Sequence, residues 1–114
     1  MRLGFLLAGL AILSSAALAQ TAPELDEKLL QAAFQSELKD ADSAKFRALR
    51  YKMDTPEGWT MCGEVNAKNS YGGYVGFQPF YALVLKIEPG PVEYSVVGMG
   101  KAAGEMCREA LLRP

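Results

Sequence analysis

Trp59 to Lys68 reads WTMCGEVNAK, and its residues fall alternately into two sets. Apolar and small residues occupy every second position from Trp59 to Ala67, whereas the positions between them hold polar residues and Cys62. A period of two residues is typical of a β-strand that buries one face. The segment therefore predicts a strand in the middle of the chain, and the other elements are assigned outward from it.

The segment before this strand predicts a second strand. Phe46 to Met53 alternates between apolar and basic residues, although Phe46, Ala48 and Leu49 blur the phase. Residues 54–58 combine an early proline with a late glycine, a composition typical of a turn. The basic side chains of this strand are expected to face solvent.

The segments after the central strand predict the rest of a sheet. Residues 69–73 form a loop, after which Tyr74 to Ile87 resumes extended structure, interrupted by Pro79 because proline cannot donate to a strand ladder. A turn at 88–91 leads into a last strand from Val92 to Val97. Three or four antiparallel strands are therefore expected.

Helices are predicted on both sides of the strands in the sequence. Thr21 followed by Glu24 matches a capping box, so a helix is expected to start there and to continue towards Leu38. Residues 39–44 favour caps and turns and predict a helix stop or a restart. Lys101 to Leu112 predicts a short closing helix.

This order of elements predicts the fold class. A helix, a run of strands and a final helix are typical of a small α+β domain, with an antiparallel sheet of three or four strands. We expect both helices to lie on one face of that sheet. Cys107 is expected on the inward side of the closing helix.

The first 19 residues match a secretory signal peptide. Arg2 precedes an apolar run from Leu3 to Leu13, and small residues then lead to Ala19. A spanning helix needs about 20 apolar residues, so a retained anchor or a buried helix is the weaker alternative. We expect cleavage near Ala19 and a single secreted domain at residues 20–114, periplasmic or extracellular, with no membrane span.

Composition excludes several classes of function. The 114 residues hold no His and carry a formal net charge of -1. The lack of His excludes histidine-based triads and most His-containing metal sites. The near-neutral net charge lacks the excess of Lys and Arg that is typical of proteins that bind nucleic acid. No metal or cofactor site is predicted.

One acid–base cluster is conceivable, formed by Glu64 with Lys68 or Tyr74. Glu64 and Lys68 lie about 13 Å apart along a strand, too far for direct proton exchange. A non-enzymatic protein is therefore expected, and an enzyme of unknown reaction is a third hypothesis.

Cys62 and Cys107 are the two cysteines of the chain. In an oxidising compartment a single pair has one connectivity, so a disulfide between them is predicted. The alternative is a pair of buried free thiols.

A polar, glycine-containing segment near residues 66–74 is the predicted binding site. Adjacent glycines and short polar side chains can expose successive backbone N–H groups, as in anion-binding nests. The residues assigned to this site are Asn66, Lys68, Asn69, Tyr71, Gly72, Gly73 and Tyr74. An envelope protein or an anionic envelope component is the expected partner. The alternative is a structural envelope protein in which the segment only sets a hairpin.

Two motifs carry a resemblance to a known family. Lys39 to Phe46 reads KDADSAKF, and Cys62 to Phe77 reads CGEVNAKNSYGGYVGF. From about Leu38 to Phe80 the chain resembles uncharacterised small bacterial secreted proteins and lipoproteins, whose members often carry Pro at the position of Ala41. The resemblance implies a Gram-negative envelope or secreted location and no established activity.

Overall fold

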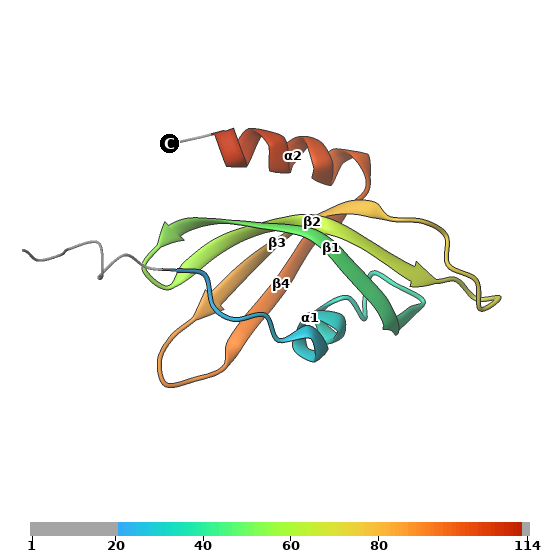
Figure 1. Cartoon of the computed structure of the whole chain (residues 1–114), viewed down its shortest axis with the longest axis horizontal. Helices are drawn as coiled ribbons and strands as arrows, with labels where there is room; N and C mark the ends of the chain where they lie inside the picture. The colour runs from blue at the N-terminus through green and yellow to red at the C-terminus, as the bar shows by residue number, and fades with distance from the viewer. Residues whose placement is uncertain (1–20, 113–114) are drawn as a thin grey trace, which may run out of the picture.

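The computed structural model of the protein describes residues 21–112. The elements in chain order are α1 (Glu27–Ala33), β1 (Asp40–Thr55), β2 (Gly58–Lys68), β3 (Gln78–Lys86), β4 (Val92–Met99) and α2 (Lys101–Leu112). The four strands form one antiparallel sheet in the order β1-β2-β3-β4 (Figure 1). The predicted α+β class is confirmed, and the sheet has four of the three or four strands expected. The predicted signal peptide lies outside the described residues.

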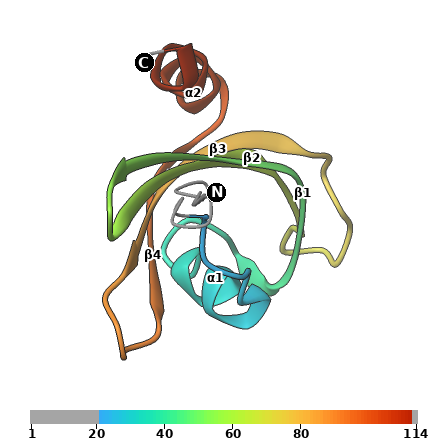
Figure 2. The ribbon, with the colours of Figure 1, turned by 60° about the vertical axis from the view of Figure 1, so that its left-hand side comes forward.

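The two helices lie on opposite faces of the sheet, so the expectation of one shared face is wrong. The curved sheet wraps around α1 on its inner face, and α2 lies across its outer face (Figure 2). Neighbouring residues of a strand point to opposite faces. Met61 therefore packs in the core on the α1 side, while Cys62 points outward and bonds to Cys107 of α2.

Aromatic rings form the centre of the inner core. Phe34, just after α1, and Phe80 of β3 are both 0% exposed, and their rings meet edge to face at 5.2 Å. Phe46 of β1 packs against both rings at 5.5 and 6.0 Å. Leu30 lies one helical turn before Phe34 and is also fully buried. These contacts fix α1 against the concave side of the sheet.

Helix α1 is shorter than the sequence pattern predicted. The capping box at Thr21 starts no helix. Instead Asp26 is the N-cap, its carboxylate accepting a hydrogen bond from the backbone N–H of Leu29 at 3.1 Å. The helix ends at Ala33, before the expected Leu38. Phe34 is the C-cap, and within α1 only Leu30 is buried.

Strand β1 begins at Asp40, six residues earlier than expected, because the predicted turn at 39–44 is a bulge within the strand. Asp40 pairs with Lys68 and Lys45 pairs with Asn66, so four residues of β1 lie opposite Ala67. The Ser43 hydroxyl donates to the Asp40 carbonyl at 2.7 Å and accepts from the Lys68 N–H at 2.8 Å. Turn-forming side chains thus supply hydrogen bonds that the ladder lacks here.

A second bulge explains the blurred phase in β1. Arg47 pairs with Glu64 and Arg50 pairs with Cys62, which leaves Ala48 and Leu49 together opposite Gly63. Ala48 has a φ of 55°, a left-handed conformation that is uncommon for a residue other than glycine. A Cβ atom at Gly63 would lie 2.6 Å from Leu49 Cδ2 and 3.2 Å from the Arg47 carbonyl oxygen, so any larger residue there would require these neighbours to shift.

The remaining boundaries follow the sequence more closely. Strand β3 starts at Gln78 rather than at Tyr74, which makes only an isolated bridge with Lys68. Strand β4 extends to Met99, two residues beyond the expected end, and α2 has its predicted bounds.

Candidate functional site

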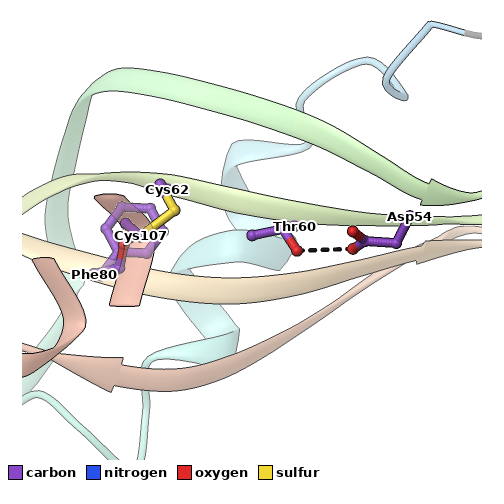
Figure 3. The surroundings of a disulfide bond; sticks show 5 residues. All are labelled: Asp54, Thr60, Cys62, Phe80 and Cys107. Carbon is purple, nitrogen blue, oxygen red and sulfur yellow. Dashed lines mark hydrogen bonds between the residues drawn. A yellow bond between two sulfur atoms is a disulfide. The ribbon is translucent and has the colours of Figure 1, made fainter. Parts of the chain in front are cut away.

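The predicted disulfide is present and joins β2 to α2. Cys62 and Cys107 are 0% and 3% exposed, and their Cα atoms lie 5.9 Å apart (Figure 3). Along the same face of β2, the buried hydroxyl of Thr60 donates to Asp54 at 2.7 Å, as Figure 3 shows. The outer face under α2 is therefore fixed by one covalent bond and by satisfied polar groups.

The segment between β2 and β3, residues 69–77, contains most of the predicted binding residues, and we call it the β2–β3 loop. The side-chain oxygen of Asn69 accepts hydrogen bonds from the N–H groups of Tyr71 at 2.9 Å and Gly73 at 3.2 Å. The N–H of Gly72 donates to the Asn69 carbonyl at 3.1 Å. These N–H groups point to acceptors within the loop, so the expectation that they stay open for an anion is wrong.

Two other predicted residues anchor the loop to the sheet. The side-chain oxygen of Asn66 accepts from the N–H of Gly76 at 2.9 Å. The Tyr74 hydroxyl donates to the Ser43 carbonyl in the bulge of β1 at 3.0 Å. Asn66, Asn69 and Tyr74 thus hold the loop in shape.

Cationic side chains of the outer face pack on the aromatic rings of the loop. The Nζ atoms of Lys45 and Lys68 lie 4.6 and 5.8 Å from the centre of the Tyr74 ring. The guanidinium of Arg47 lies 3.8 Å from the centre of the Phe77 ring. Cation–π contacts of this kind contribute about 0.5–1 kcal/mol each at exposed sites.

The conceivable acid–base cluster does not assemble around Glu64. Its Oε1 atom pairs with Arg47 Nε at 2.6 Å. Within residues 21–112, no hydrogen bond or ion pair links Glu64 to Lys68 or Tyr74. The Tyr74 side chain instead contacts Ser43, Lys45 and Lys68. The arrangement offers an ion pair here and no proton-transfer pair.

Tyr71 differs from the other predicted residues because it projects from the loop. Its side chain is 96% exposed, and the neighbouring Val75 is 60% exposed. Gly72, at a φ of 85°, makes the tight turn beside it. The loop therefore presents an aromatic side chain on a backbone fixed by internal hydrogen bonds.

Three residues on β1 that support this loop were not predicted from the sequence. Ser43, Lys45 and Arg47 each contact the β2–β3 loop through a hydrogen bond or an aromatic ring. The alternating basic residues of β1 indicated that Lys45 and Arg47 lie on one face. Which aromatic rings they contact depends on the pairing register of the strands.

Two tyrosines away from the loop have perturbed acidity. Burial, and then the neighbouring Tyr94, raise the pKa of Tyr51 above its usual value. Burial is also the largest cause that raises the pKa of Tyr94, whose hydroxyl accepts a hydrogen bond from the Asp26 N–H at 3.1 Å. Both groups stay protonated at neutral pH, so neither acts as a base there.

Residues 21–112 contain no cluster of three or more side chains suited to hold a metal ion. In the same part of the chain, no helix has the length and hydropathy needed to cross a membrane. Comparisons with known protein families, curated proteins and solved structures find no match.

Proposed function

We propose that this protein is a non-enzymatic binding module of the bacterial envelope that recognises a partner through the β2–β3 loop. The observation that carries the proposal is Tyr71, 96% exposed at the tip of a loop whose backbone is held by Asn66 and Asn69. Exposed aromatic side chains on fixed backbones are frequent anchors of protein interfaces, because little conformational entropy is lost on binding.

The residues of the loop divide into two roles under this proposal. Asn66, Asn69 and Tyr74 form the scaffold through the hydrogen bonds given above. Tyr71 contacts the partner, and Lys68 adds positive charge at the end of β2, where the loop begins. An envelope protein or an anionic envelope component therefore fits the surface.

The proposed location is the periplasm or the cell exterior, after removal of residues 1–19. The N-terminal sequence pattern and the Cys62–Cys107 disulfide support it, since disulfides persist in oxidising compartments.

Affinity capture from an envelope extract tests the proposal. Residues 20–114 are used as bait beside a Lys68→Ala/Tyr71→Ala variant, with Lys28→Ala in α1 on the opposite side of the sheet as the matched control. We expect a component retained by the wild type and by Lys28→Ala and lost from the double variant. Equal retention by all three folded proteins would refute recognition by the loop.

A structural role is the second candidate, and the internal hydrogen bonds of the loop favour it. In that case Asn69 and Tyr74 only close the end of the sheet, and Tyr71 has no partner. A melting temperature does not separate the two roles, because both predict that Tyr71→Ala leaves it unchanged. The capture experiment separates them, since only recognition by the loop predicts a component that the double variant loses.

A further inference from the structure

A hollow lies on the outer face of the sheet, apart from the β2–β3 loop. It has a volume of about 300 Å³ and is lined by residues of β1, β2, β3 and α2. Small residues at Ala48, Gly63 and Gly104, together with the disulfide, leave this space open. Arg50 of β1 and Arg108 of α2 both line it.

The bulge in β1 directs Arg50 to this face. Arg47 and Arg50 are three positions apart, and in a regular strand they would point to opposite faces. Because Ala48 and Leu49 together oppose Gly63, Arg50 pairs with Cys62 and shares the outer face with Arg47. The left-handed Ala48 that permits this also lines the hollow. Bulges commonly redirect side chains beside functional sites.

The two guanidinium groups have no anionic partner within residues 21–112. Within this part of the chain neither Arg50 nor Arg108 forms an ion pair or a side-chain hydrogen bond, and both side chains are exposed. Glu64 is the one carboxylate among the described lining residues, and Arg47 already pairs with it. Arg50 and Arg108 thus line one small hollow, and the carboxylate that lines it with them is already paired with Arg47.

Helix α2 lies close to the sheet, so that Arg108 forms part of the lining of the hollow. Cys107, the residue before it, is bonded to Cys62 on the floor. A Cβ atom at Gly104 would lie 3.1 Å from Pro79 Cγ, so glycine permits close approach of α2 to β3. The position of Arg108 is therefore set by the covalent bond and by this packing.

We propose that this hollow binds the phosphate group of a small phosphate monoester between Arg50 and Arg108. A phosphate monoester carries about −1.5 to −2 charges at neutral pH, which matches two guanidinium groups. Guanidinium groups bind phosphate oxygens through paired, charge-assisted hydrogen bonds. The volume lies at the lower end of the range of small-molecule sites, so the rest of the ester is small.

The test is a titration followed by amide ¹H–¹⁵N NMR shifts at constant ionic strength. Glycerol phosphate and inorganic phosphate are the probes, and glycerol and sodium chloride are the blanks. We expect saturable shifts centred on residues lining the hollow with both phosphates, with glycerol phosphate binding at least as tightly. Arg50→Gln and Arg108→Gln should each weaken binding about tenfold or more.

Lys101→Gln is the matched control, because it removes a positive charge from α2 outside the hollow and should leave the affinity within about twofold. Absence of saturable shifts, or equal affinity in wild type and both arginine variants, would overturn the proposal. The hollow is separate from the β2–β3 loop, so the result of this titration does not decide the outcome of the capture experiment.

Discussion

The hydroxyl group of Tyr74 donates a 3.0 Å hydrogen bond to the backbone carbonyl of Ser43, across 31 positions of the sequence. Ser43 in turn accepts from the N–H of Lys68, the last residue before the β2–β3 loop. The loop and the first bulge of β1 therefore support each other. This mutual support fixes the backbone that carries Tyr71.

Tyr74→Phe should destabilise the protein by about 1 kcal/mol, because it removes the hydrogen bond to Ser43 and keeps the ring. Chemical denaturation followed by the fluorescence of the single tryptophan, Trp59, measures the change. Tyr71→Phe is the control and should leave stability within about 0.5 kcal/mol, since its side chain is exposed. Equal stability of Tyr74→Phe and wild type would contradict the supporting role of Tyr74.

Gly72→Ala and Gly73→Ala should differ in their effects although the residues are adjacent. Gly72 has a φ of 85°, whereas Gly73 has no positive φ, and a Cβ atom would meet nothing within 4 Å at either position. Alanine at 72 should cost about 1 kcal/mol of folding free energy from backbone strain alone. Alanine at 73 should cost less than about 0.5 kcal/mol, and equal costs would argue against the observed turn.

Ala48→Gly should stabilise the protein, by about 0.5–1 kcal/mol, because glycine adopts the left-handed conformation without strain. Thermal or chemical denaturation measures the gain. Ala67→Gly, at a buried position in β2, is the comparison and should destabilise instead. A loss of stability in Ala48→Gly would mean that β1 lacks this bulge in solution.

Loss of the disulfide should lower stability by roughly 4 kcal/mol on a chain-entropy estimate for its sequence separation of 45. A Cys62→Ala/Cys107→Ala variant, compared with the oxidised wild type by denaturation, measures this. If stability were unchanged, the bond would not constrain the unfolded chain as expected.

Stability should fall as the pH rises above 10.0, the ordinary pKa of tyrosine. The folded-state pKa values of Tyr51 and Tyr94 are raised, so in that window the unfolded chain loses these protons first, and unfolding is favoured. Below pH 10.0 the contribution is fully present. Denaturation midpoints at several alkaline pH values should fall less steeply in Tyr94→Phe, and an identical slope would contradict the raised pKa.

Strands β2 and β4 and helix α2 could be predicted from the sequence, because their periodicity agrees with their burial. The extension of β1 to Asp40 could not be predicted, because residues 41–44 have the composition of a turn. In the structure they form a bulge inside the strand. The opposite placement of the helices followed from the alternation of Met61 and Cys62. The sequence pattern alone does not show which face of the sheet each helix covers.

The binding site stays a prediction, and the sequence places it in a segment rather than at individual residues. Asparagine, glycine and tyrosine favour both binding loops and self-contained turns. Only the three-dimensional contacts separate Asn69, which bonds within the loop, from Tyr71, which faces solvent. The hollow beside Arg50 was beyond prediction, because it depends on a bulge that changes the phase of β1.

Site-specific photocrosslinking tests whether the β2–β3 loop contacts a partner. A photoreactive residue replaces the exposed Ser70, beside an intact Tyr71, and in a second protein replaces Lys28 on α1. In envelope extracts the account predicts a discrete adduct from position 70 that disappears when Tyr71→Ala is added, and none from position 28. No adduct at position 70, or one that is unaffected by Tyr71→Ala, would contradict recognition through the β2–β3 loop.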